Sequence, residues 1–281
     1  MPRDLRAGVE THWTTFGHGP RRALAIHCTL AHAGSWAGLG ARLAERMTLI
    51  AFDLPGHGQT APWDAGMGEV QGLSAAMALD FATDLAAEAS GEIATGTVDL
   101  MGHSFGATVA LRLAVERPDL VRSLVLIEPV LFAVAFADDP GARARYEADM
   151  SGYARALAAG DTVTAAREFT AIWGDGRDWD ALPEAARAAL ARDIPMIDAA
   201  GPALMEDVAG VLAPGALERI ACPVLLLGGS ASPAITEAIT EGLAARLPHA
   251  ARAMIGGAGH MSPITHPRQV ASELQRFFDE V

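Results

Sequence analysis

The sequence contains few of the features that mark metal-binding, secreted or membrane proteins. It has two cysteines in 281 residues, and both Cys28 and Cys222 lie in or beside an apolar run, outside any Cys-x-x-Cys or Cys/His spacing. A structural metal site requires such spacing, so we expect no metal. Residues 1–10 lack the apolar stretch of a signal peptide, which favours a cytoplasmic location. The longest apolar stretch, 124–137, contains a Glu-Pro pair and is shorter than the roughly 20 residues that span a bilayer.

Positive charge is also scarce. The formal net charge is −13, and no basic block offsets it. Long-range repulsion opposes binding to nucleic acids and to anionic membranes, so we expect neither as a partner. The sequence has no phosphate-binding glycine loop and no dinucleotide fingerprint, so we expect no cofactor. With 51% apolar and 20% charged residues, the composition is that of a packed globular protein.

Short apolar runs alternate with helical patterns along residues 1–128 and again along 216–281. Such runs are typical of strands that are buried on both faces, as in parallel sheets covered by helices. The pattern predicts an α/β fold with a mostly parallel, doubly wound sheet. Ser74 is the expected N-cap of one helix. The expected strands are 22–28, 47–53, 97–102, 121–128, 222–229 and 251–257, and the expected helices are 39–46, 74–88, 105–117, 234–247 and 267–279.

The alternation stops at residues 129–215, where helical patterns dominate. We interpret this stretch as a helical insertion that follows the strand ending at Glu128. Residues 1–128 and 216–281 would then form one α/β core. The sequence shows no internal repeat that would indicate another architecture.

The segment Gly102-His103-Ser104-Phe105-Gly106 fits the pattern Gly-x-Ser-x-Gly. It stands directly after an expected strand and directly before an expected helix. In that context the pattern forms a sharp turn that presents the serine hydroxyl at the edge of a sheet. Ser104 is therefore a candidate nucleophile. Its alternative role is an ordinary N-cap of the helix.

A serine hydroxyl is a weak nucleophile until a base removes its proton. Of the nine histidines, His260 is the best placed, because it lies in a glycine-rich loop just after the last expected strand. An ordinary surface-loop histidine is the alternative interpretation. His266 is a second candidate, although a His-Pro pair at the start of a helix more simply marks a helix boundary.

Four segments together resemble one protein family: HCTLAHAGSW at 27–36, DLPGHG at 53–58, GHSFG at 102–106 and GAGH at 257–260. In this order and at these intervals they resemble α/β-hydrolase-fold proteins with a helical cap. The resemblance covers nearly the whole chain. It implies that residues 129–215 are the cap, or lid, and that a nucleophile, an acid and a histidine follow one another in that chain order.

The acid of this family usually follows the strand before the histidine strand, but that place reads Gly-Gly-Ser-Ala at 228–231. Another arrangement in the family places the acid after the strand that follows the nucleophile helix, where this chain has Glu128. We therefore assign Glu128 as the third member of a catalytic triad with Ser104 and His260. A buried carboxylate is costly unless it is paired, which supports such a partner. A solvated glutamate and a dyad without an acid stay open, and Glu237 lies too far along a helix to serve.

The resemblance also implies an oxyanion hole formed by the backbone N–H groups of Phe105 and Thr29. Where the family commonly has His-Gly, this chain has His27-Cys28. Cys28 is interpreted as a small buried apolar residue, with a reactive thiol as the alternative.

Further residues are expected around the site. Asp53 and the glycines after it should hold a loop that borders the site, and His57 is given no catalytic role. Several large side chains are candidates for lining a substrate cavity under the cap, although such residues more often belong to a core. These candidates are Trp36, His103, Met150, Trp173, Trp179, Met196 and Met205.

The candidate residues favour acyl chemistry, first of all carboxylic ester hydrolysis of a small, fairly apolar substrate through an acyl-enzyme on Ser104. A serine nucleophile argues against haloalkane dehalogenation and epoxide hydrolysis by the usual relatives. Lactone hydrolysis, C–C bond hydrolysis of ring-cleavage products and perhydrolysis use the same groups and stay open. A non-catalytic ligand-binding protein and an interaction protein acting through the insertion are alternatives from other classes. The expected partner is a small acyl substrate, bound by a monomer or homodimer.

Overall fold

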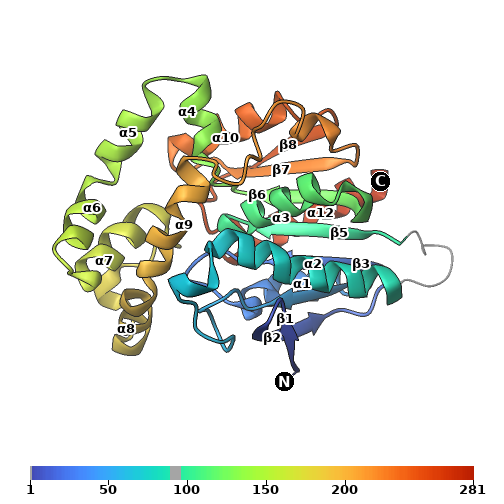
Figure 1. Cartoon of the computed structure of the whole chain (residues 1–281), viewed down its shortest axis with the longest axis horizontal. Coiled ribbons are helices and arrows are strands. Elements are labelled where there is room, and N and C mark those ends of the chain that lie inside the picture. The colour runs from blue at the N-terminus through green and yellow to red at the C-terminus, as the bar shows by residue number, and fades with distance from the viewer. Residues whose placement is uncertain (1, 89–95) are drawn as a thin grey trace.

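The computed structural model describes residues 2–88 and 96–281, and in this part of the chain eight strands form one sheet. Their order is β1-β2-β4-β3-β5-β6-β7-β8 (Figure 1). Neighbouring strands from β4 to β8 are parallel, whereas β1 and β2 are antiparallel additions at one edge. The predicted mostly parallel sheet is therefore confirmed. The strands are β1 Arg3–Arg6, β2 Val9–Phe16, β3 Arg21–Ile26, β4 Met47–Phe52, β5 Val98–His103, β6 Val121–Ile127, β7 Val224–Gly229 and β8 Ala250–Ile255.

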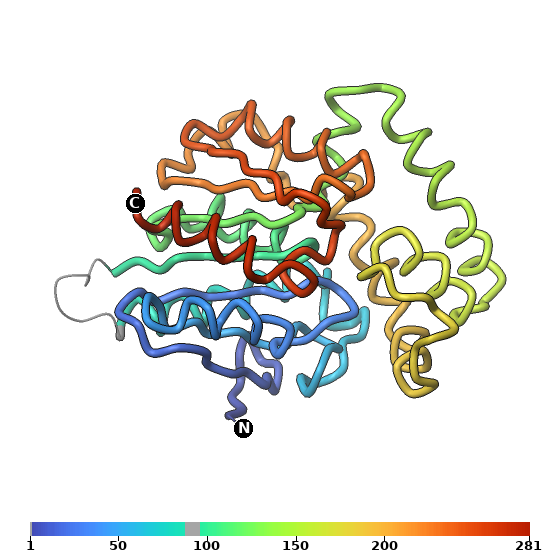
Figure 2. The backbone as a smooth tube through the Cα atoms, turned by 180° about the vertical axis from the view of Figure 1, so that it is seen from behind, coloured from blue at the N-terminus to red at the C-terminus, as the bar shows by residue number. Residues whose placement is uncertain are grey.

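Helices cover both faces of the sheet. Helices α2, α3 and α10 pack on one face, and α1 and α12 pack on the other. Figure 2 shows the face covered by α1 and α12. The remaining long helices, α4 to α9, follow one another between β6 and β7. The helices are α1 Ala37–Leu43, α2 Val70–Glu88, α3 Phe105–Glu116, α4 Phe132–Asp138, α5 Ala142–Asp149, α6 Ser151–Ala158, α7 Thr162–Trp173, α8 Glu184–Asp193, α9 Pro195–Met205, α10 Ala234–Ala244, α11 Ser262–Thr265 and α12 Pro267–Glu280.

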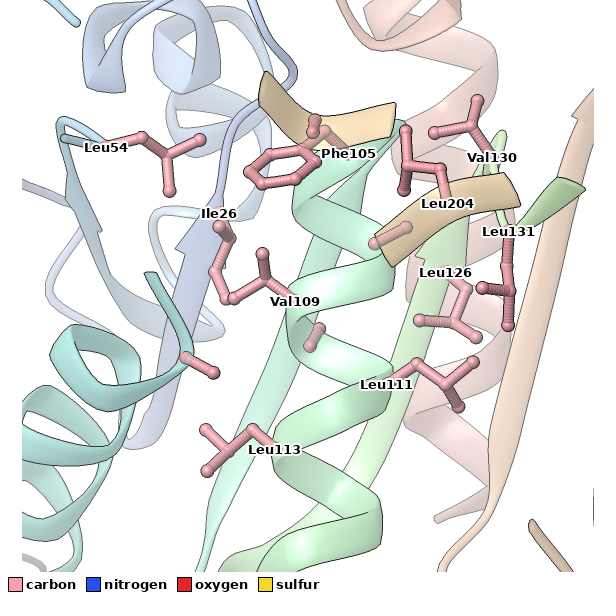
Figure 3. Packing of buried hydrophobic residues seen from close by; sticks show 14 of the residues in the cluster. Ile26, Leu54, Phe105, Val109, Leu111, Leu113, Leu126, Val130, Leu131 and Leu204 are labelled. Carbon is pink, nitrogen blue, oxygen red and sulfur yellow. The ribbon is translucent and has the colours of Figure 1, made fainter. Parts of the chain in front are cut away.

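Burial on both faces explains why the central strands are apolar throughout. Along β3, Leu24 and Ile26 join the core under α3, and the alternating residues Ala23 and Ala25 join the core under α1 and α12. Side chains of successive strand residues point to opposite faces, so both sets must be apolar. Figure 3 shows the first of these cores, with Val109 of α3 directed toward Ile26.

Helix α2 begins earlier than the sequence pattern predicts. It starts at Val70, and Ser74 lies inside it with its hydroxyl donating to the Val70 carbonyl at 2.6 Å. The prediction that Ser74 is the N-cap is therefore wrong. The carboxylate of Glu69 accepts from the backbone N–H groups of Gln71 and Gly72 at 2.6 and 2.7 Å instead, which satisfies the free donors of the first turn.

Residues 132–205, which we call the helical segment, contain helices α4 to α9. The segment lies beyond the carboxyl ends of the parallel strands, to one side of the sheet in both overall views (Figures 1 and 2). Ligands of open α/β sheets bind at this edge. Within residues 2–88 and 96–281, no helix combines the length and the apolar character that crossing a membrane would demand.

Candidate active site

Ser104 lies on a strained turn between β5 and α3. Its backbone has φ 56° and ψ −119°, a region that residues other than glycine rarely adopt. The flanking glycines leave no room for a side chain. A Cβ atom at Gly102 would lie 2.3 Å from the carbonyl oxygen of Gly106, and a Cβ atom at Gly106 would lie 2.2 Å from the carbonyl oxygen of Ile26. The Ser104 side chain caps no helical N–H group, so its hydroxyl is available for other contacts.

The structure brings together three residues that are distant in sequence. The Oγ atom of Ser104 lies 2.9 Å from Nε2 of His260, and Nδ1 of His260 lies 3.1 Å from Oε2 of Glu128. Each residue follows the carboxyl end of a parallel strand, namely β5, β8 and β6. All three are buried, with 6%, 4% and 0% of their surfaces exposed. The arrangement matches the geometry of a nucleophile, a base and a group that orients the base.

Glu128 is held by the loop that lacks the family's usual aspartate. Its Oε1 atom accepts hydrogen bonds from the backbone N–H of Gly229 and from the hydroxyl of Ser232, the latter at 2.9 Å. The other carboxylate oxygen faces His260. Glu128 itself has φ 51°, so the chain bends sharply at the end of β6. These donors offset the cost of burying the carboxylate and fix its direction.

The neighbouring His103 supports the histidine loop through the backbone. Its Nε2 lies 2.8 Å from the carbonyl oxygen of His260. Burial, followed by the proximity of His260, lowers the pKa of His103 to about 3, so this ring is neutral at neutral pH. A carbonyl oxygen only accepts, so the proton is on Nε2 of His103 and is donated to His260.

Two backbone N–H groups beside the cavity have no hydrogen-bond partner within the described residues. Within the described residues, those of Thr29 and Phe105 donate no hydrogen bond to the protein, and both residues border the same cavity as Ser104. His27 stabilises the loop of Thr29 through two hydrogen bonds. Its Nδ1 donates to the carbonyl of Cys28 at 2.7 Å, and its Nε2 accepts from the N–H of Leu54 at 2.9 Å. Burial, with a smaller effect of a neighbouring histidine, lowers the pKa of His27 to about 3, which keeps it neutral for this role.

Asp53 organises the next loop, as the sequence suggests. One carboxylate oxygen accepts from the N–H of Ala33 at 2.7 Å, and the other accepts from the N–H of Gln59 at 2.9 Å and lies 2.8 Å from Nδ1 of His12. His57 is buried, and its Nδ1 donates to the carbonyl of Pro55 at 2.9 Å.

The cysteines contribute no reactive group here. Burial raises the pKa of the Cys28 thiol to about 12 and that of Cys222 to about 11, so both stay protonated. The two are not joined by a disulfide. Within the described part of the chain, no group of three or more histidine, cysteine or acidic side chains has the geometry of a metal site.

A cavity of about 120 Å³ opens beside Ser104 and His260. The helical segment supplies most of its wall, and Phe105, Val130 and Leu204 connect it to the core seen in Figure 3. Of the cavity residues predicted from the sequence, Trp173 and Met205 border it. Trp173 also packs edge-on against the imidazole of His260, with ring centroids 4.7 Å apart.

The other predicted cavity residues lie elsewhere, which corrects the sequence interpretation. Trp36 is only 1% exposed and belongs to the core on the α1 and α12 face of the sheet. His103 lies behind His260. Met150 lies behind Trp173, whose indole N–H donates to the Met150 sulfur at 3.4 Å. Trp179 and Met196 also lie away from the cavity. Trp179 is buried in the core, and Met196 packs near Gly56.

The alternative candidates for base and acid have other partners. His266 lies at the start of α12 with Nδ1 2.9 Å from the hydroxyl of Thr265. Glu237 forms an ion pair with Arg252 on the outer face of α10. Within the described residues, neither side chain forms a hydrogen bond with Ser104 or His260.

Comparison with known proteins places the chain in a family. Residues 23–273 match the family model described as the alpha/beta hydrolase family. The chain belongs to the alpha/beta hydrolase family. This assignment, together with the sheet order and the carboxyl-edge position of the three residues, supports a hydrolase.

Relatives of this alpha/beta hydrolase include named esterases. A pimeloyl-[acyl-carrier protein] methyl ester esterase of Nitrosomonas europaea is 26% identical over 93% of this chain and 96% of its own length. A lipase of Mycobacterium tuberculosis is 37% identical, but over 44% of this chain and 43% of its own length. Among solved structures, an esterase of Thermogutta terrifontis has a TM-score of 0.74 at 20% identity, covering 100% of this chain and 99% of that one. At that identity the structural likeness concerns the fold alone.

Sequence reasoning missed most of the cavity wall of this alpha/beta hydrolase. Its aromatic and aliphatic residues come from separate helices, and no local motif marks them. The signal that was available is composition, because most aromatic residues of the helical segment border the cavity. The missed residues are Val130, Phe132, Tyr146, Tyr153, Phe169, Ile197, Asp198, Ala200, Gly201 and Leu204.

Proposed function

We propose that this protein is a serine hydrolase that cleaves a carboxylic ester, or a closely related acyl bond, of a small and fairly apolar molecule. The observation that carries the proposal is the pair of contacts from His260, 2.9 Å to the hydroxyl of Ser104 and 3.1 Å to the carboxylate of Glu128. The relatives named as an esterase and as a lipase support the reaction class.

In the first half of the reaction, Ser104 Oγ attacks the substrate carbonyl carbon as Nε2 of His260 takes the hydroxyl proton. Glu128 is a positioning residue, because it holds Nδ1 of His260 and stabilises the imidazolium that forms. The negative oxygen of the tetrahedral intermediate is bound by the N–H groups of Phe105 and Thr29. The intermediate then collapses, His260 gives its proton to the leaving alkoxide, and the acyl group remains on Ser104.

In the second half, a water molecule gives a proton to His260 and attacks the acyl carbon. Collapse of this second intermediate returns the proton to Ser104 and releases the carboxylic acid. We assign residues 129–215 the role of a cap on the core formed by 1–128 and 216–281. The largely apolar cavity bordered by the helical segment favours substrates that present mainly carbon surface to its wall.

Hydrolysis of lactones or of C–C bonds in ring-cleavage products, and perhydrolysis, would use the same groups, as would binding of a ligand without turnover. The available hydroxyl of Ser104 beside His260 favours turnover over binding alone.

The test is labelling with a fluorophosphonate, read as the mass of the intact protein and of its peptides. We expect stoichiometric labelling at Ser104 in the wild-type protein, none in Ser104→Ala, and slowed labelling in Glu128→Ala. Ser232→Ala is a milder control, since it removes one hydrogen bond to Glu128 and leaves the carboxylate in place. A folded wild-type protein that takes up no label would overturn the proposal in favour of ligand binding.

A further inference from the structure

The wall of the cavity beside Ser104 combines several aromatic rings with few basic side chains. Among residues 2–88 and 96–281, five aromatic residues border it, and the histidine of the candidate triad is its only basic lining side chain. The five are Phe132, Tyr146, Tyr153, Phe169 and Trp173. Contacts connect them in two groups: Phe132 lies 4.4 Å from Tyr146 and 5.9 Å from Trp173 between ring centroids, and Tyr153 lies 5.7 Å from Phe169. The faces of aromatic rings attract cations.

A carboxylate lies on the same cavity. Asp198 of α9 borders it and is exposed to solvent, so its side chain lies at the opening. Among residues 2–88 and 96–281, no arginine or histidine forms an ion pair with Asp198. Asp198 stands in the first turn of α9, so the helix N-terminus stabilises its charge, but within the described part of the chain no cationic side chain neutralises it.

Tyr153 adds a polar atom that the protein leaves unused. The residue is 9% exposed, and within the described residues its hydroxyl is buried without a hydrogen-bond partner. Tyr153 and Asp198 border the same cavity, and burial, followed by the negative charge of Asp198, raises the pKa of Tyr153 to about 12. The lone pairs of this oxygen are the negative end of the hydroxyl dipole, so they can face a cation without a hydrogen bond.

We propose that this cavity binds a substituted ammonium group, so that the substrate of the proposed serine hydrolase carries a cationic, alkylated nitrogen on the part that enters the cavity. The rings supply cation–π contacts, Asp198 supplies the counter-charge at the opening, and the free lone pairs of the Tyr153 oxygen face the positive charge. The inference rests on the proposed function for the chemistry at Ser104. The binding itself requires no turnover.

The test compares two ligands of nearly the same shape, choline and 3,3-dimethyl-1-butanol, in which a quaternary carbon replaces the quaternary nitrogen. Equilibrium titrations on the Ser104→Ala protein measure both dissociation constants without any reaction. We expect choline to bind about tenfold more tightly than its neutral counterpart, from the combined cation–π and charge attraction. Equal or weaker binding of choline would overturn the inference.

Two variants test whether Asp198 and Tyr153 cause the preference for choline. Asp198→Asn should reduce the ratio of the two constants to about twofold, and Tyr153→Phe should reduce it to an intermediate value. Glu206→Gln is the matched control, because it removes one negative charge at the C-terminal end of the same helix and does not border the cavity. A ratio that stays high in Asp198→Asn would show that the carboxylate takes no part in binding, and a ratio that falls equally in Glu206→Gln would show that net charge alone attracts choline. Either result would refute the site.

The outcome is separable from that of the proposed function. If fluorophosphonate labels Ser104 but choline shows no preference, the inference fails and the serine hydrolase stands. If choline binds selectively and the serine takes no label, the cavity assignment survives and the esterase does not.

Discussion

The carbonyl oxygen of His260 accepts a hydrogen bond of 2.8 Å from Nε2 of His103, the residue immediately before Ser104. The turn that presents the serine and the loop that presents the histidine are thus joined directly, across 157 positions of sequence. Glu128 completes the connection, since it is hydrogen-bonded to His260, to the last residue of β7 and to Ser232 in the loop after it. Hydrogen bonds from buried groups therefore fix all three residues before any substrate binds, as preorganised catalysis requires.

The role of Glu128 predicts a large effect on the rate of turnover. Glu128→Gln keeps the shape of the side chain but removes the charge that stabilises the His260 imidazolium. We expect kcat to fall by about a thousandfold to ten-thousandfold with little change in KM, measured on a p-nitrophenyl ester.

Glu237→Gln is the matched control for that measurement, because it removes a glutamate charge from the outer face of α10. Its kcat should stay within about twofold of the wild-type value. A Glu128→Gln enzyme that retains most of its activity would show that Ser104 and His260 act as a dyad.

Substitution of a glycine by alanine should have opposite effects on stability at the Ser104 turn and within α9. Gly106→Ala places a methyl group 2.2 Å from the carbonyl oxygen of Ile26, so we expect the free energy of unfolding to fall by about 3 kcal/mol or more. Gly201→Ala lies within α9 and meets no atom within 4 Å, so it should raise stability by about 0.5 kcal/mol. Urea denaturation followed by circular dichroism measures both. Equal stability of the two variants would contradict the steric account of the turn.

Buried neutral histidines predict a loss of stability in acid. The pKa of His103 is about 3 in the folded protein, against an ordinary value of 6.5. Between these values the unfolded chain binds more protons than the folded one, so the free energy of unfolding decreases as the pH falls from 6.5 toward 3. His103→Gln keeps a hydrogen-bond donor but cannot titrate.

In that variant, the slope of unfolding free energy against pH between about 4 and 5.5 should be smaller by about 1.4 kcal/mol per pH unit. His27, which is buried and neutral in the same way, keeps its own contribution. Urea titrations at several pH values give both slopes, and unchanged slopes would contradict the assigned neutral state of His103.

A buried ion cluster at the other end of the sheet predicts a change in stability without a change in catalysis. Asp99 is fully buried and accepts hydrogen bonds from Arg21, Arg122 and Ser123. Burial alone would raise its pKa, but hydrogen bonds from Arg122 and Arg21 lower it overall, so the carboxylate stabilises the fold above its ordinary pKa and loses this effect as acid protonates it.

Asp99→Asn leaves the two arginines without a counter-charge, and we expect a loss of about 3 kcal/mol of unfolding free energy at neutral pH. Asp119→Asn breaks an exposed pair with Arg117 and should change stability little. Denaturation midpoints measure both variants. Similar midpoints for the two would show that the Asp99 cluster contributes no more than a surface pair.

The sequence carried the information for those parts of the site that depend on local chain geometry. Ser104 is marked by glycines whose spacing has a steric cause, and both Glu128 and His260 follow strands that the apolar pattern identifies. Parallel strands end at one edge, so the topology alone brings these residues near one another.

The cavity was less predictable because its wall depends on how separate helices pack. Trp36 looks like a pocket residue in sequence but packs against the back of the sheet. Tyr153 and Asp198 meet at the cavity from α6 and α9, and no spacing along the chain relates them. Strands β1 and β2 were also missed, since edge strands with mixed polar residues lack the apolar run that identifies the central ones.

The central claim is that Ser104 forms a covalent acyl intermediate. The most direct measurement is the intact mass of the protein, quenched in acid during turnover of a p-nitrophenyl ester and followed by peptide mapping. The account predicts one added acyl group on Ser104 in the wild-type protein and none in Ser104→Ala. The fraction of wild-type protein that carries the acyl group at steady state should be larger for esters whose deacylation is slow. Ester hydrolysis that continues in Ser104→Ala at the wild-type rate, or an acyl group found on another residue, would contradict it.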